Sequence, residues 1–311
     1  MNASVLIVSA TLLELQRQTS ESLNPPGNNQ PYTFQTVDSI NWSSFAYMQY
    51  ATNAAYLCNS VMLFERLHRL TSKADRLMMY PNTFSANEKD TSYESRLLRK
   101  ARDEYGVELM PVKVQTQTTW AESYTKLLAF NQTQYKRVLS LDSDATVLQP
   151  MDELSLLPPC PVAMPRAYWL NNSNSRTLGS HVLLIQPSEF EFARITAAIA
   201  NAGSSDYDME IVNKLYKDSA LILPHRPYGL LTGEFRFTSH TAYLDWPVPK
   251  PWVPASPSTV QEEKPACEMD PATGREDDCR ARDLWLGFYA DFAIRRESVC
   301  GMAVASGLET G

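Results

Sequence analysis

No apolar stretch in this sequence is long enough to cross a bilayer, which takes about 20 residues in a helix. The most apolar segment near the start is SVLIVSATLLEL, residues 4–15, which is short and has no basic flank. This segment is predicted to be a first strand or helix, with the remnant of a signal anchor as the alternative. We expect no integral membrane span in this chain.

A block of basic residues is also missing, and the formal net charge is −7. Proteins that bind nucleic acid usually gather lysine and arginine on one face, so we expect no nucleic-acid partner. An acidic protein that binds an anion needs local help from a metal ion or from a few placed lysines.

Zinc-binding patterns are absent too, because the five cysteines form no C-x-x-C pair and no cysteine–histidine cluster has zinc spacing. Cys58 and Cys160 lie in apolar contexts, which predicts core positions. Cys267 and Cys279 flank a polar loop, where a disulfide and two free thiols are both possible. Four N-x-Ser/Thr sequons permit the secretory pathway, so the location stays open between the cytoplasm and the Golgi or secretory lumen. The sequon asparagines are Asn2, Asn41, Asn131 and Asn171.

The sequence does contain an alternation of strand-like and helix-like segments, which is typical of a largely parallel sheet with helices on both faces. We expect a single α/β domain over residues 45–311, after a polar and partly irregular arm at 1–44. The predicted strands are 45–52, 75–81, 107–114 and 136–144, and the predicted helices are 54–70, 92–106, 121–132 and 281–301.

The strand at 136–144 runs directly into two aspartates, Asp142 and Asp144. Ligands of such sheets bind beyond the carboxyl ends of the strands. Two carboxylates on rigid backbone suit Mn²⁺ or Mg²⁺, which prefer oxygen ligands. The alternative is that both side chains cap the next turn through backbone amides. The local sequence does not favour either reading.

Five pieces of the sequence, in this order, carry a family likeness: FAYMQYATNAAYLCNSVMLFERL, YTKLLAFNQTQYKRVLSLDSDATVLQPMDEL, HVLLIQPS, DMEIVNKLY and YLDWPVPKPW. Over residues 45–301 the chain resembles glycosyltransferase family 8, the glycogenin-like enzymes, and within it the fungal glucose N-acetyltransferase-like branch. The resemblance implies a single GT-A domain. It also implies a metal-dependent transfer of a sugar from a UDP-sugar to an acceptor hydroxyl, with retention of the anomeric configuration.

The resemblance further implies a metal and diphosphate site. Asp142 and Asp144, with Ser143 between them in the D-x-D motif, would hold Mn²⁺ or Mg²⁺. Lys250, stiffened by the prolines around it, would meet a phosphate oxygen as a point charge. Lys126, in the motif T-K-L, would reach toward the donor, with a helix lysine that points to water as the alternative.

The third metal ligand departs from the family pattern. A family histidine shortly before K-P-W aligns with Ala242 here, and His240 lies two residues earlier. Residues two apart in a strand face the same side, so a shifted register would bring His240 to the metal. The alternative is that water fills this position.

The remaining site residues also follow from the resemblance. Asp208 and Asn213 match the active-site aspartate and asparagine, but Met209 stands where the family has glutamine. For Asn213 the alternative is a helix residue with a solvent-facing amide, and for Tyr50 and Tyr56 it is packing at a strand end and on a helix face. The residues that match the base-binding loop, or that could stack on uracil, are Tyr50, Ala51, Thr52, Asn53 and Tyr56.

The expected function is therefore a UDP-sugar-dependent glycosyltransferase whose acceptor is a glycan, a protein or a small molecule. Two alternatives stay open at this point. One is a degenerate protein that binds nucleotide or glycan without turnover. The other is a metal-dependent phosphohydrolase, which the lack of a histidine-rich two-metal pattern argues against.

Overall fold

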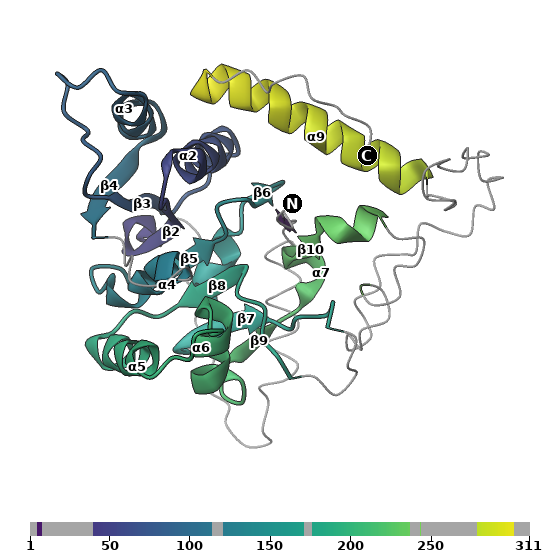
Figure 1. The fold of residues 1–311 in the computed structure, drawn as a ribbon. Helices are drawn as coiled ribbons and strands as arrows, with labels where there is room; N and C mark the ends of the chain where they lie inside the picture. The colour runs from purple at the N-terminus through teal and green to yellow at the C-terminus, as the bar shows by residue number, and fades with distance from the viewer. Residues whose placement is uncertain are drawn as a thin grey trace.

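The computed structural model describes residues 5–7, 40–113, 121–170, 176–236, 243 and 279–301. Its main sheet has seven strands in the order β4-β3-β2-β5-β8-β7-β9 (Figure 1). β2, β3, β4 and β5 are parallel, whereas β8 runs antiparallel to both β5 and β7. The strands are β2 (Phe45–Tyr50), β3 (Asp75–Pro81), β4 (Val107–Val112), β5 (Arg137–Leu141), β7 (Val162–Pro165), β8 (Val182–Ile185) and β9 (Leu221–Leu223).

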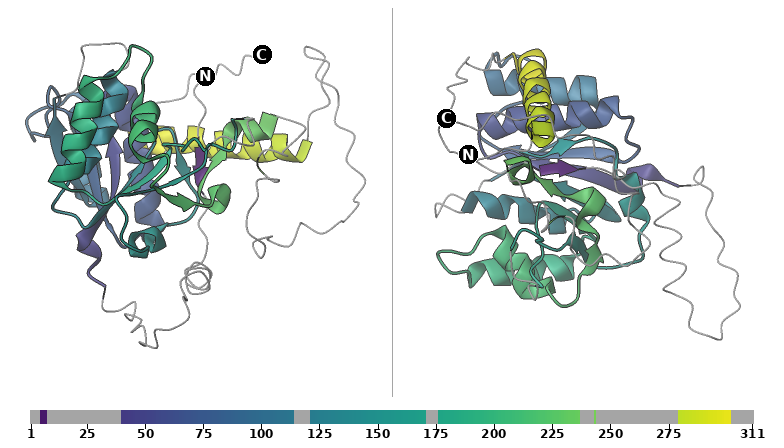
Figure 2. Two further views of the ribbon diagram at one scale, coloured as in Figure 1. Left: turned by 90° about the horizontal axis from the view of Figure 1, so that it is seen from below. Right: turned by 90° about the vertical axis from the view of Figure 1, so that its right-hand side faces the viewer.

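Apolar side chains fill both faces of this sheet because the strands alternate between two hydrophobic clusters. In β2, Tyr47 packs into one cluster and Met48 into the other. The first cluster contains residues of α2 (Ala54–Arg69), α3 (Tyr93–Tyr105) and the end of α9 (Cys279–Cys300). The second contains residues of η3 (Thr125–Asn131), α5 (Glu189–Ala200) and α6 (Asp208–Tyr216). Helices therefore cover both faces of the sheet (Figure 2), and the predicted α/β class is confirmed.

Local signals set the ends of several helices. The side chain of Asn53 accepts from the amides of Ala55 and Tyr56 at 3.0 and 3.1 Å, which caps the start of α2. Helix α3 ends at Gly106, whose φ of 63° is the left-handed conformation that glycine tolerates best. The remaining helical elements are η2 (Trp42–Ser44), α4 (Ala121–Tyr124), η4 (Asp152–Leu156), α7 (His225–Tyr228) and η5 (Thr232–Arg236).

A second, small sheet has the order β10-β1-β6. Its strands are β1 (Val5–Ile7), β6 (Thr146–Val147) and β10 (Leu230–Leu231). β1 falls within the segment 1–44 that the sequence predicts to be an arm, yet it pairs with strands far along the chain. Three residues of the predicted arm thus belong to a sheet of the domain.

The predicted helix at 121–132 forms differently from the expectation. It is one turn of α-helix, α4, followed by the seven-residue 3₁₀ helix η3. Residues three apart lie on the same face in a 3₁₀ helix, as they nearly do in an α-helix. The spacing of apolar residues therefore cannot distinguish a 3₁₀ helix from an α-helix. The predicted helices 54–70, 92–106 and 281–301 are found as α2, α3 and α9.

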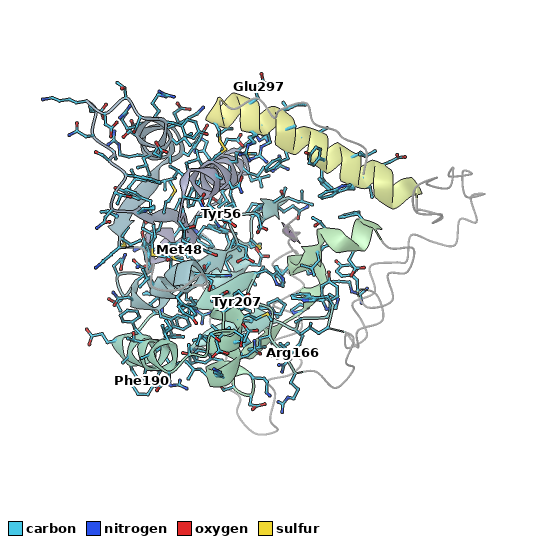
Figure 3. The ribbon with its side chains drawn as sticks, in the orientation of Figure 1. Met48, Tyr56, Arg166, Phe190, Tyr207 and Glu297 are labelled. Atoms are coloured by element: carbon cyan, nitrogen blue, oxygen red, sulfur yellow. A yellow bond between two sulfur atoms is a disulfide. The ribbon has the colours of Figure 1, made fainter. Side chains whose placement is uncertain are left out.

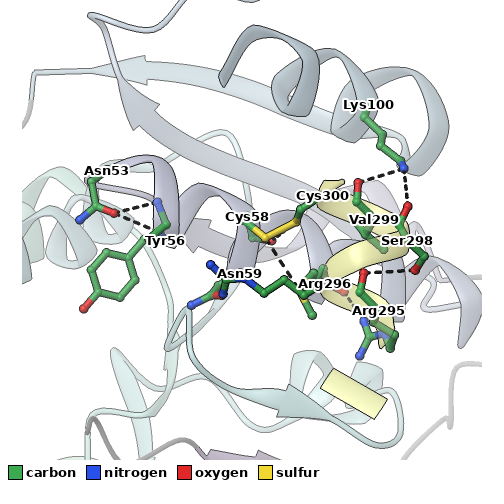
Figure 4. Close-up of a disulfide and its surroundings, with 12 residues drawn as sticks. Asn53, Tyr56, Cys58, Asn59, Lys100, Arg295, Arg296, Ser298, Val299 and Cys300 are labelled. Atoms are coloured by element: carbon green, nitrogen blue, oxygen red, sulfur yellow. Dashed lines mark hydrogen bonds between the residues drawn. A yellow bond between two sulfur atoms is a disulfide. The ribbon is translucent and has the colours of Figure 1, made fainter. Parts of the chain in front are cut away.

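A disulfide joins Cys58 of α2 to Cys300 of α9 (Figure 4). The prediction that Cys58 lies in the core is confirmed, but its bond to Cys300 was not predicted. Cys160 has a half-buried free thiol. Cys267, for which a disulfide to Cys279 and a free thiol were both predicted as possible, lies outside the described residues. Beside the bond, Arg295 donates to Glu65 at 2.8 Å and to the carbonyl of Met62 at 2.5 Å.

Helix α9 packs on the domain, against α2 and η5. Trp285, Phe288 and Phe292 are half-buried, and Phe235 of η5 stacks on Trp285 with ring centroids 6.3 Å apart. Leu284, in contrast, is 51% exposed. None of the helices within the described ranges is long and apolar enough to span a membrane.

Candidate active site

The site lies at the carboxyl edge of the sheet, where β2 ends at Tyr50 and β5 ends at Leu141. Because β8 runs antiparallel to β5, its first residue pairs with Leu141. The amide of Asp142 donates to the carbonyl of His181 at 3.3 Å. The end of one strand and the start of another are thereby fixed side by side.

Lys126 is the centre of this arrangement. Its side chain is fully buried, and its ammonium lies 2.5 Å from Oδ1 of Asp142 and 3.7 Å from Oδ2 of Asp208. It also donates to the carbonyl of Ser180. Burial lowers the pKa of Lys126, but the charges of Asp142 and Asp208 outweigh burial and leave the pKa above its ordinary value. The lysine is therefore charged and does not point to water.

Three carboxylates share this one lysine. Burial and the neighbouring charge of Asp142 raise the pKa of Asp144 to about 6. Burial also raises the pKa of Asp208, a shift that Lys126 opposes and Asp142 reinforces. Burial raises both pKa values because it disfavours the charged form of a carboxyl group, and Lys126 offsets this only in part.

The donor set fits a divalent cation in its chemistry. Carboxylate oxygens are the ligands that Mg²⁺ and Mn²⁺ prefer, and the site has negative charge to spare. Within the described ranges, however, no group of three or more His, Cys, Asp or Glu side chains is placed to hold a metal. Asp142 and Asp144 are the residues here that could do so. The predicted third ligand His240, together with Ala242 and Lys250, lies outside the described residues.

The predicted base-binding loop follows β2 directly. Burial and the charges of Asp142, Asp208 and Asp144 raise the pKa of Tyr50 well above its ordinary value, so its phenol stays protonated beside the carboxylates. The amide of Ala51 donates to the carbonyl of Met79 at 2.9 Å. This loop is therefore held at the same edge as the aspartates.

The other loop residues lie next to it. Thr52 is half-buried, and Asn53 caps α2 as described above. Tyr56 projects from the first turn of α2 (Figure 4). In the view with side chains, Tyr56 and Tyr207 lie on the two sides of β5 and β8 (Figure 3). The structure thus brings Tyr50 to the acidic cluster, and leaves the predicted roles of Ala51, Thr52, Asn53 and Tyr56 as predictions.

Asn213 is engaged with the backbone. Its amide oxygen accepts from the amide of Leu178 at 2.8 Å, and its amide nitrogen donates to the carbonyls of Leu178 and Met209 at 2.9 and 2.8 Å. This side chain fixes the segment that leads to Ser180. Ser143 is buried between the two aspartates.

Sequence reasoning did not identify three residues of this site. Ser180 supplies the carbonyl that Lys126 binds and a hydroxyl that bonds to Asp208. Gln49 donates to the carbonyl of Leu141 at 2.8 Å and ties β2 to the end of β5. His181 is buried beside them. A glutamine in the otherwise apolar run of β2 was the one available signal, since a buried polar side chain needs a partner.

Taken together, these features define an α/β protein with an acidic, lysine-bridged site at the carboxyl edge of its sheet. The chain is 54% identical over 293 residues to glucose N-acetyltransferase 1 from Gibberella zeae, a match that covers 84% of this chain and 63% of that protein. It is 41% identical over 312 residues to glucose N-acetyltransferase 1 from Aspergillus fumigatus, covering 87% of this chain and 80% of that protein. The chain belongs to the glucose N-acetyltransferase 1 family.

The comparisons with family models and with solved structures do not contribute to the family assignment. No family model matches the chain. Among solved structures, the glycosyltransferase GlyE from Streptococcus pneumoniae is 20% identical, with a TM-score of 0.43 over 58% of this chain and 45% of that one. Because the TM-score is below 0.5, the family assignment rests on the curated relatives. The chain spans 63% of the length of the Gibberella zeae relative.

Proposed function

We propose that this chain transfers a sugar from a UDP-sugar to an acceptor hydroxyl, with Mn²⁺ or Mg²⁺ as cofactor and with retention of the anomeric configuration. The observation that carries the proposal is the bridge from Lys126 to Asp142 and Asp208 at the carboxyl edge of the sheet, beside Tyr50. Ligands of α/β sheets bind at this edge, and a nucleotide diphosphate needs positive charge there.

Asp142 and Asp144 would hold the cation, which when bound offsets the charge that develops on a departing diphosphate. The roles of the chain's own residues follow from their contacts. Lys126 donates to Oδ1 of Asp142 and so fixes the carboxylate that would hold the cation. Asp208 lies at the start of α6 and is held by Ser180 and Lys126, and we propose it as the carboxylate that acts near the donor sugar or the acceptor hydroxyl.

The names of the relatives suggest a second candidate, the transfer of an acetyl group to glucose. Acetyl transfer from a thioester has no diphosphate leaving group and so does not need an acidic metal site. The carboxylates at this edge therefore favour nucleotide-sugar chemistry. We would test UDP-N-acetylglucosamine and UDP-glucose first, because the relatives' name contains both glucose and an N-acetyl group.

The test measures UDP release from a panel of UDP-sugars, with Mn²⁺ and with or without candidate acceptors, alongside acetyl transfer from acetyl-CoA to glucose. We expect UDP release with at least one donor, and its loss in Asp144→Asn. Asp103→Asn, on the exposed side of α3, is the matched control and should behave as the unaltered protein. Acetyl transfer without UDP release would contradict the proposal.

A further inference from the structure

The edge of the sheet opposite the acidic site carries one of the four sequons, Asn131-Gln132-Thr133. Gln132 is buried, and its amide donates to the carbonyl of Leu128 at 3.1 Å. With φ −82° and ψ 56°, Gln132 is the centre of an inverse γ-turn, in which the amide of Thr133 donates to the carbonyl of Asn131 at 2.9 Å. The buried middle residue anchors the turn, and the side chains of Asn131 and Thr133 are exposed.

This turn lies at the amino end of β5, whereas the acidic site lies at the carboxyl edge of the sheet. Lys126 and Asn131 lie in the same 3₁₀ helix, five residues apart, which corresponds to roughly 10 Å along its axis. After the turn the chain enters β5 at its amino end. Beside the turn is an open groove of about 420 Å³ lined by Thr133, Gln134 and Gln186 among others. A bulky group on Asn131 therefore has open space and does not block the carboxyl edge.

The disulfide between Cys58 and Cys300 is a second, independent observation. Both cysteines are buried, with 0% and 6% of their surface exposed. Disulfides form and persist in oxidising compartments such as the lumen of the endoplasmic reticulum. Asparagine in a sequon is glycosylated in the same compartment.

The other sequons fit less well. Asn41 is exposed on the same edge, where the carbonyl of Ser44 accepts from Lys136 at 2.7 Å. The hydroxyl of its Ser43, however, is bonded to Asp75. Asn2 and Asn171 lie outside the described residues.

We propose that Asn131 carries an N-linked glycan. The donor is an oligosaccharide linked through its anomeric carbon to a lipid diphosphate. A bond forms between Nδ2 of Asn131 and that carbon, the bond from the carbon to the diphosphate oxygen breaks, and the amide nitrogen gives up one proton. The lipid diphosphate is the leaving group, so no oxidant or reductant is needed.

The experiment maps peptides of the full-length protein purified from the cells that make it, before and after treatment with peptide N-glycosidase. The peptide that contains Asn131 is expected to carry hexose and N-acetylhexosamine mass, and the enzyme should convert Asn131 to aspartate. An unmodified Asn131 in the purified protein overturns the proposal.

Three variants produced in the same cells make the test specific. Asn131→Gln and Thr133→Ala should each lose the glycan. On a denaturing gel both variants should therefore migrate faster than the unaltered protein, with a difference in mass of one glycan. Thr133→Ser keeps the hydroxyl that the sequon needs and should keep the glycan. Retention of the glycan in Thr133→Ala, or its loss in Thr133→Ser, would contradict modification at this sequon.

Discussion

The buried ammonium of Lys126 lies 2.5 Å from Oδ1 of Asp142, and the two residues come from η3 and from the end of β5. This pair joins the segment between β4 and β5 to the edge of the sheet. A buried charge that loses its partner is strongly destabilising, whereas a pair removed as a whole is not.

Lys126→Met should therefore lower the free energy of unfolding by roughly 3 kcal/mol, since Asp142 and Asp208 would lose their only nearby cation among the described residues. Urea unfolding in the presence of a chelator measures this. The double variant with Asp142→Asn should lose less than the sum of the two single variants, because the two groups are coupled. Strict additivity would show that the pair does not interact.

A second prediction concerns Asn213, whose amide binds the backbone of Leu178. Asn213→Ala should lower the free energy of unfolding by about 2 kcal/mol, because it leaves the amide and the carbonyl of Leu178 without partners. Asn201→Ala is the matched control, since Asn201 makes one exposed bond to the carbonyl of Ala197 at 2.8 Å. If Asn213→Ala lowered turnover but left stability unchanged, Asn213 would act in catalysis alone.

A third prediction follows from His181, which packs against Trp169 and has no hydrogen-bond partner for its ring nitrogens among the described residues. Burial, with the charges of Lys126 and His225, lowers the pKa of His181 to about 3. The unfolded chain binds a proton here below about pH 6.5, and the folded chain does not until about pH 3. Stability is therefore present above this window and is lost as the pH falls through it.

The contribution of His181 to this loss should be about 2 kcal/mol between pH 8 and pH 5. Urea unfolding at several pH values gives the slope. His181→Gln should reduce the slope by this amount. The rest of the slope comes from His225, whose pKa burial also lowers, and from Asp144 and Asp208, whose raised pKa values act in the opposite direction. His68→Gln, an exposed position on α2, should keep the full slope. An unchanged slope in His181→Gln would mean that folding does not lower the pKa of this imidazole.

The fourth prediction concerns the disulfide. Its reduction, or the change Cys300→Ser, should lower the free energy of unfolding by roughly 2–4 kcal/mol, because the bond restricts the unfolded chain. Thermal unfolding with and without reductant measures the loss. Cys160→Ser should retain the full response to reductant, since Cys160 is a free thiol. Equal stability of the oxidised and reduced protein would show that the bond adds nothing.

The parts of the fold that could be predicted are those with a local signal. β2 and β5 are apolar because both faces of the sheet are covered, and Asp142 follows β5 directly in the chain. Because β2 and β5 are parallel, the residues at their carboxyl ends, Tyr50 and Asp142, lie at the same edge of the sheet. The segment that contains β1 could not be assigned to a strand or a helix, because three residues are too few to show a periodic spacing of apolar side chains.

The parts that could not be predicted depend on contacts between distant segments. Asp208 lies 82 residues beyond Lys126 in the sequence. No local pattern in either segment indicates that both side chains form hydrogen bonds with Ser180. Nor does the sequence around Lys126 indicate that its ammonium lies buried between the carboxylates of Asp142 and Asp208. The bond from Cys58 to Cys300 spans 242 residues, and only the fold brings the two thiols together.

That bond also makes residues 58–300 a closed covalent ring, which holds β3, β4, β5, β7, β8 and β9 and leaves β2 outside it. A single nick anywhere within the ring opens it without releasing a piece. The nicked protein would run as one band on a non-reducing gel and as two bands once reduced. Integrity of the backbone must therefore be checked under reducing conditions, because an oxidised sample conceals the cut.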